Sequence, residues 1–231
     1  MTNKITKGIY NLYRDFVHFD FAKPLEEKLL VSFETAESLN KWRLITDKEI
    51  GGFSTAQLKY NDSTKTMKFC GNISKELPKD NERIKNSGYA GTYLKEIDSE
   101  HTSIDWNKFK SLEIRVHSND KRCYTMGILN REEKQIMYKQ LFTTTPGVWE
   151  TLELDLDDFF KVVKGNLHLN IEKMPRNSIY SLGFVQSEKT PGPFELDIQY
   201  IKLIPPGRQA NTLDPRLVSS KGRVIKLPEY E

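Results

Sequence analysis

Apolar and charged residues alternate along the middle of the chain. In residues 112–117, Leu-Glu-Ile-Arg-Val-His, aliphatic side chains fall on one side of an extended backbone and polar side chains on the other. A period of two residues is typical of a β-strand with one buried face. Four more stretches repeat the pattern, with inner-face residues Met67, Phe69, Gly71 and Ile73; Tyr124, Met126 and Ile128; Leu152, Leu154 and Leu156; and Phe194, Leu196 and Ile198.

The last of these stretches changes phase. After Ile198 the apolar positions move to Ile201 and Leu203, which are three and five residues further on. One extra residue in a strand shifts its alternation in this way. The pattern therefore predicts a bulge, or a change of sheet, near Tyr200.

Turn sequences separate the alternating stretches at fairly regular intervals, at residues 79–81, 118–120, 145–147 and 191–193. Short strands with such turns favour an all-β sandwich over a βαβ fold. Helical periodicity is limited to short pieces, which predict helical turns at residues 3–16, 36–41 and 156–162. We expect three parts: an N-terminal extension at 1–28, a β-sandwich domain at 29–204 and an extended C-terminal tail at 205–231.

The charge and hydropathy of the chain limit the classes of partner that it can bind. The 231 residues include 35 Lys and Arg and 32 Asp and Glu, interspersed, for a net charge of +3 and a mean hydropathy of −0.60. This distribution offers no basic stripe for a phosphate backbone, so we expect no nucleic-acid partner. No apolar run approaches the roughly 20 residues that span a bilayer, so we expect any membrane contact to be peripheral.

The residues that usually hold metals or cofactors are sparse. Cys70 and Cys123 are the two cysteines, and the four histidines are scattered without a pair at helical spacing. Neither arrangement matches a disulfide framework or a zinc site. We therefore expect reduced thiols, no metal and no cofactor.

The first residues leave two interpretations open. Lys4, Lys7 and Arg14 precede the first acidic residue, Asp15, and apolar residues near them can share one helical face. That pattern resembles a weak mitochondrial presequence, and it equally fits an ordinary surface helix.

The sequence Gly52-Phe-Ser-Thr-Ala56 raises the question of a nucleophilic serine. A nucleophile elbow needs a helix after the serine, whereas here an alternating stretch predicts a strand. We interpret Gly51 and Gly52 as a structural turn in which the Asp47 and Ser54 side chains bind loop amides. Asp47 and Ser54 also remain candidates for contacting a partner or ligand. We expect no catalytic residue and no enzymatic activity.

A second set of candidates would suit a sugar. Trp106 at a loop end can stack on a sugar ring, and Asp120 and Arg122 can bind its hydroxyls. A carbohydrate-binding β-sandwich module is therefore the alternative function. For Trp106 the ordinary alternative is a place in the core, which is the commoner fate of a tryptophan.

An ordered series of segments runs through the predicted domain. It comprises residues 42–54, with a tryptophan before an aspartate and a Gly-Gly-x-Ser turn, then 86–91, 105–116, 179–184, 192–198 and 214–217. This series, over about residues 29–217, resembles the complex I intermediate-associated protein 30 family. The family's glycine-flanked acidic turn corresponds to residues 118–122, which lack both glycines.

The resemblance implies a galactose-binding-domain-like jelly-roll sandwich and a role as a non-enzymatic assembly factor, or chaperone, for mitochondrial complex I. It further implies a location in the mitochondrial matrix, associated with the inner membrane. Expected partners are complex I assembly intermediates, an acyl-CoA-dehydrogenase-type flavoprotein and a signalling-intermediate scaffold. The role would be carried out by protein–protein binding.

Overall fold

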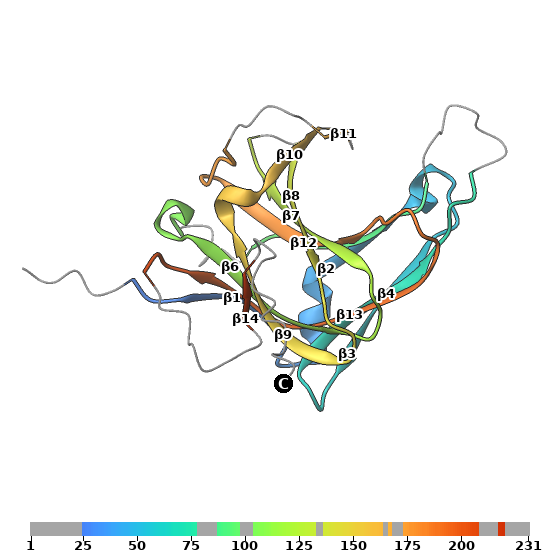
Figure 1. The fold of residues 1–231 in the computed structure, drawn as a ribbon, viewed down its shortest axis with the longest axis horizontal. Coiled ribbons are helices and arrows are strands. Elements are labelled where there is room, and N and C mark those ends of the chain that lie inside the picture. Colours follow the sequence, from blue (N-terminus) through green and yellow to red (C-terminus); the bar gives the residue numbers. More distant parts are fainter. Residues whose placement is uncertain are drawn as a thin grey trace, which may run out of the picture.

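The computed structural model describes residues 25–77, 87–97, 104–132, 136–163, 166–167, 173–207 and 217–219. Within these ranges the chain forms two seven-stranded sheets that pack face to face, with few helical residues (Figure 1). The predicted all-β jelly-roll sandwich is confirmed. The expected helix at 3–16 and the turn at 79–81 lie outside the described residues.

Sheet A has the strand order β14-β9-β6-β13-β4-β3, with β1 also pairing with β13. Its strands are β1 (Lys28–Ser32), β3 (Thr55–Asn61), β4 (Thr66–Ile73), β6 (Ser111–Ser118), β9 (Val148–Asp155), β13 (Gly192–Ile204) and β14 (Leu217–Ser219). All pairs are antiparallel except β14 with β9. The short β14 comes from the region that we assigned to the C-terminal tail.

Sheet B has the order β11-β10-β8-β7-β12-β5-β2 and is antiparallel throughout. Its strands are β2 (Trp42–Thr46), β5 (Ala90–Leu94), β7 (Cys123–Asn130), β8 (Ile136–Thr143), β10 (Phe160–Val163), β11 (Asn166–Leu167) and β12 (Ile179–Gln186). Four 3₁₀ turns connect strands of the two sheets: η1 (Ala36–Lys41), η2 (Asp47–Ile50), η3 (Trp106–Lys108) and η4 (Leu156–Asp158).

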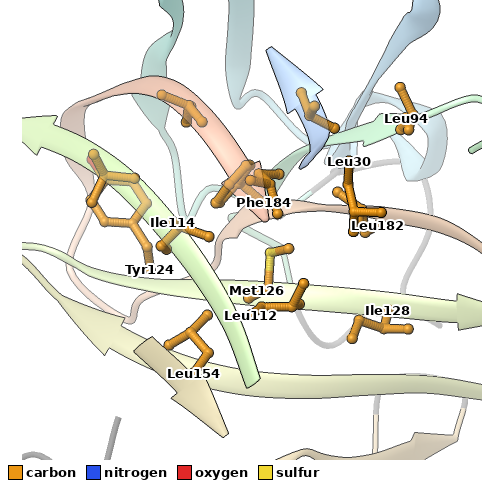
Figure 2. Close-up of a cluster of buried hydrophobic side chains, with 14 of the residues drawn as sticks. Leu30, Leu94, Leu112, Ile114, Tyr124, Met126, Ile128, Leu154, Leu182 and Phe184 are labelled. Carbon is orange, nitrogen blue, oxygen red and sulfur yellow. The ribbon is translucent and has the colours of Figure 1, made fainter. Parts of the chain in front are cut away.

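The core lies between the sheets, and the alternating residues fill it as predicted. Leu112 and Ile114 of β6 are fully buried and face Tyr124, Met126 and Phe184 of sheet B (Figure 2). Burying apolar side chains of this size contributes about 1.5–3 kcal/mol each, so this layer is the main source of stability.

The phase change in β13 is a bulge. Opposite β6, the register shifts between Ile198 and Tyr200, and both halves of β13 remain in sheet A. β13 pairs with β4 through its first half and with β1 through its second. The alternative of a change of sheet is therefore wrong.

The helical prediction for residues 156–162 is half wrong. η4 occupies Leu156–Asp158, but Phe160–Val163 forms strand β10 beside β8. Two adjacent valines favour the pleated conformation, and pairing with β8 satisfies their backbone groups. The turn predicted at residues 36–41 is present as η1.

Candidate functional site

Asp47 lies at the centre of the glycine turn and is fully buried. Its Oδ1 accepts the backbone N–H of Ser54 at 2.8 Å, and its Oδ2 accepts the Ser54 hydroxyl at 2.8 Å and the Gly88 N–H at 2.6 Å. A buried carboxylate is tolerated when donors surround it in this way. Asp47 thus joins three segments at one end of the sandwich.

Ser54 is equally enclosed. Its hydroxyl binds Asp47 and also accepts the N–H of Ser74 at 3.1 Å. A nucleophilic serine needs a general base and access to substrate, and this fully buried hydroxyl has a carboxylate partner and no histidine beside it in the described chain. The geometry is that of a structural bond, so neither Asp47 nor Ser54 presents its side chain to a partner.

The two glycines of the turn serve different purposes. Gly51 has a φ of 85° and ends η2 in the left-handed conformation that glycine adopts at low cost. Gly52 does not have a positive φ, but a Cβ there would lie 2.3 Å from the Asp47 Cγ. Gly51 is needed for its backbone angle and Gly52 for the close approach of the carboxylate.

Arg122 binds the loop before β13 and the start of that strand. Arg122 is 9% exposed, and its guanidinium donates to the carbonyl oxygens of Thr190 (2.7 Å), Pro191 (3.1 Å) and Pro193 (2.7 Å). Its Nη1 also lies 3.4 Å from the Glu188 carboxylate, so Arg122 binds groups of its own chain. The geometry does not favour the sugar contact considered for Arg122, because its Nε, Nη1 and Nη2 each donate to a carbonyl oxygen of the same chain.

The Asp120 carboxylate is occupied in the same region. Its Oδ2 accepts the Glu195 N–H at 2.8 Å and the Tyr124 hydroxyl at 2.7 Å. Burial, and after it the bond to Asp120, raises the pKa of Tyr124 far above its ordinary value, so the phenol stays a donor. Asp120 holds the start of β7 to β13 and is not positioned as a ligand contact.

Trp106 belongs to the core. It is 2% exposed and sits in η3, whose first turn is capped by the Asp105 side chain. An indole with so little exposed surface has no free face for a sugar ring. The stacking role considered from the sequence is therefore wrong, and the ordinary core role holds.

The outer face of sheet B is a feature that the sequence pattern did not predict. Cross-strand pairs align Arg43, Tyr93, Gly183, Gly127 and Lys139 in one row across five strands. A Cβ on Gly183 would meet the Tyr93 ring at 2.6 Å, and one on Gly127 would meet it at 3.2 Å. The ring therefore lies flat over both glycines, on the face that points away from the core. The glycines within the strands are the one feature of the sequence that could have indicated this site, because a glycine inside a strand often marks the close approach of another group.

The described residues provide neither a cluster of metal ligands nor a helix that could span a membrane. Across the ranges given above, no group of three His, Cys, Asp or Glu side chains could hold a metal ion. His117 is the one histidine within them, and its ring packs at a tilt against Trp149, with ring centroids 5.2 Å apart. Among the residues described, no helix is long and apolar enough to cross a membrane.

The fold is similar to that of solved carbohydrate-binding modules. One is a family 11 module from Clostridium thermocellum in complex with a β-1,3-1,4-mixed-linked tetrasaccharide, with a TM-score of 0.55 and 17% identity over 78% of this chain and 95% of that one. Another is the family 11 module of the cellulosomal cellulase Lic26A-Cel5E of the same organism, with a TM-score of 0.56 and 16% identity over 79% and 96%. At such identities the likeness shows the sandwich fold alone.

Sequence relatives carry a different name. Complex I intermediate-associated protein 30, mitochondrial, of Mus musculus is 29% identical over 192 residues, covering 78% of this chain and 58% of the relative. The Drosophila melanogaster protein of the same name is 27% identical over 190 residues, covering 78% and 64%. The chain thus spans about three fifths of each relative's length. The family model described as complex I intermediate-associated protein 30 matches residues 31–198, most of the sandwich, and the chain therefore belongs to the complex I intermediate-associated protein 30 family.

Proposed function

We propose that this protein is a non-enzymatic assembly factor for mitochondrial respiratory complex I, and that it acts by binding protein partners. The observation that carries the proposal is the family match over residues 31–198, together with two relatives named for association with complex I intermediates. The match covers the sandwich, so the role is proposed for this domain.

The geometry of the turns supports binding over catalysis. Ser54, the one side chain considered as a nucleophile, is buried and bound to Asp47, and Arg122 is likewise buried in bonds within the chain. They give the loops fixed shapes, and a fixed surface binds a partner with little loss of conformational entropy.

The same bonds argue against the carbohydrate-binding alternative at the loops. Trp106 has no free face, and Asp120 and Arg122 have partners in the chain. Likeness to carbohydrate-binding modules is likeness of fold, which does not carry a ligand.

Location and finer partners follow from the proposed role. We place the protein in the mitochondrial matrix, at the inner membrane surface, with an acyl-CoA-dehydrogenase-type flavoprotein and a signalling-intermediate scaffold as partners in one assembly complex. Its contact with the membrane is peripheral. The basic amphipathic start, with Lys4, Lys7 and Arg14, supports import into mitochondria.

The role in complex I assembly can be tested by removing the protein from cells and then restoring it. Cells without the protein are expected to accumulate complex I intermediates and lose assembled complex I on native gels, and the full chain is expected to restore it. Normal complex I in cells that lack the protein would contradict the proposal. A matched add-back of Ser54→Ala separates assembly from catalysis, because a folded variant is expected to restore the complex.

A further inference from the structure

The two outer faces of the sandwich differ in charge. On sheet A, Lys68 lies 3.1 Å from Glu195 and 3.4 Å from Asp197, and His117 lies 3.4 Å from Asp197. Acidic and basic side chains are thus interspersed and paired on neighbouring strands. This is the usual form of a sheet face that meets water.

Sheet B is different because its strands contain no acidic residue. Over β2, β5, β7, β8, β10, β11 and β12 the charged residues are Arg43, Lys139 and Lys161, and Asp and Glu do not occur. The central strands are buried along most of their length on both sides. The chain itself therefore covers these central strands on both sides, and the part of this face that is open to a partner lies beside them, on β8.

Lys139 is the charged group nearest the centre of this outer face. It pairs across strands with Gly127 of β7 and Phe160 of β10, and Met137 and Leu141 lie two residues away on the same side of β8. Removal from water lowers the pKa of the Lys139 ammonium. No carboxylate of the described chain lies within ion-pair distance of it.

An apolar side chain stands open next to this ammonium. Leu141 is 55% exposed, the largest exposed fraction among the large hydrophobic residues described. The Sδ atom of Met137, two residues before Lys139 in the strand, accepts a hydrogen bond from the Tyr93 hydroxyl at 3.0 Å. This bond holds the Met137 side chain in place. We call Met137, Lys139 and Leu141 the β8 patch.

We propose that the β8 patch is a protein-docking surface, whose partner places a carboxylate on Lys139 and an apolar side chain on Leu141. This rests on the proposed function, because the partner is taken to be a component of a complex I intermediate. The choice of partner follows from charge: a desolvated cation on a face whose strands have no acid is complementary to an acidic group from another chain.

Other occupants fit the patch less well. A nucleic acid or lipid headgroup surface is held by many cations, whereas one ammonium stands in the β8 patch. A sugar needs an exposed aromatic face, and Tyr93 is 3% exposed.

Charge reversal at the patch tests the proposal. Tagged wild type, Lys139→Glu and Lys139→Arg are expressed in cells that lack the native protein, and co-captured complex I subunits are quantified by mass spectrometry. We expect Lys139→Glu to reduce capture about tenfold or more and Lys139→Arg to retain it. Lys59→Glu is the matched control, because Lys59 is exposed on β3 in sheet A and undergoes the same charge change.

A second variant covers the case in which Lys139→Glu fails to fold. Leu141→Asp changes an exposed side chain, so its melting temperature is expected to match wild type while capture falls. Capture by folded Lys139→Glu and Leu141→Asp at the wild-type level would overturn the docking surface and leave the proposed function intact. A wild-type chain that captures no complex I subunit would overturn both.

The remaining occupants give distinct results. Sugar binding by the wild type on a glycan panel that disappears in Leu141→Asp would make the patch a lectin site. A wild-type dimer by light scattering that becomes a monomer in Lys139→Glu would make the occupant a second copy. Either result would overturn the proposal.

Discussion

The Asp47 carboxylate binds Ser54 through both of its oxygens. Oδ1 accepts the Ser54 backbone N–H and Oδ2 accepts the Ser54 hydroxyl, each at 2.8 Å. The two residues are seven positions apart, and the bonds close η2 and the glycine turn onto the start of β3. Ser54, which resembles an exposed nucleophile in the sequence, is a buried residue whose hydrogen bonds to Asp47 hold the loop in place.

Replacing Asp47 is expected to destabilise the fold strongly. Asp47→Ala leaves the Ser54 N–H, the Ser54 hydroxyl and the Gly88 N–H without their acceptor, and unpaired buried donors cost about 1–3 kcal/mol each. We predict a loss of at least about 3 kcal/mol, seen as a fall in melting temperature of roughly 6–12 °C. Thr46→Ala is the control, because its 3.3 Å bond to the Lys48 N–H is exposed and its loss costs about 1 kcal/mol. Equal melting temperatures for the two variants would contradict this account of Asp47.

Alanine at Gly52 is expected to act through Asp47. The new Cβ would lie 2.3 Å from the Asp47 Cγ, so the carboxylate must move away from its donors. Gly207→Ala is a suitable comparison, because Gly207 has a φ of 80° and no atom within 4 Å of its Cβ position, which leaves backbone strain of about 1–2 kcal/mol. We predict that urea denaturation shows a larger loss for Gly52→Ala than for Gly207→Ala. The reverse order would mean that the turn can relax around a side chain.

Trp106→Ala is expected to reduce stability, not sugar affinity. Removing a large aromatic side chain from a packed core typically costs about 3–5 kcal/mol, and Trp106 is 2% exposed within the main apolar cluster. Trp149 is only partly buried and packs on His117, so Trp149→Ala should cost less. Chemical denaturation of both variants measures the difference. Wild-type stability in Trp106→Ala would show that the indole is not a core residue.

The lowered pKa of Glu195 is expected to make the free energy of unfolding depend on pH. Its bond from Asn119 at 2.6 Å, and then the Lys68 ammonium, lower the pKa of Glu195 below its ordinary value of 4.5. The unfolded chain therefore binds more protons near that pH, and the stabilisation present above it is lost as the pH falls further. We predict that wild type loses more stability than Glu195→Gln between about pH 6 and pH 3.5 in urea titrations. Parallel losses in the two proteins would contradict the assignment.

The sequence predicted those parts of the fold in which one face is buried and the other meets water. In β6, Leu112, Ile114 and Val116 are buried at the positions that alternation assigns to the core, although Glu113 between them is also buried. β5 has five buried residues in succession, so the periodic signal is absent there. Strand β10 overlaps the stretch 156–162 that is predicted as helical, because a strand of four residues shows too little of the two-residue period to be identified.

The candidate site was less predictable because its bonds join distant residues. Arg122 meets the carbonyl oxygens of residues about 70 positions away, which no local pattern reports. The residue types at Asp120 and Arg122 suit a ligand as well as a loop, and only the fold decides between them. Gly127 and Gly183 carried a usable signal, but identifying Tyr93 as their neighbour requires the strand register.

The most direct test of the central claim is the migration of the tagged wild-type protein in mitochondria that are solubilised in mild detergent and separated on a native gel. Each slice is analysed by mass spectrometry for the protein and for complex I subunits. We predict that the protein is found together with partly assembled complex I and is absent from the mature enzyme, as expected of an assembly factor. A protein that migrates alone, or that binds a glycan column and no complex I subunit, would contradict the account.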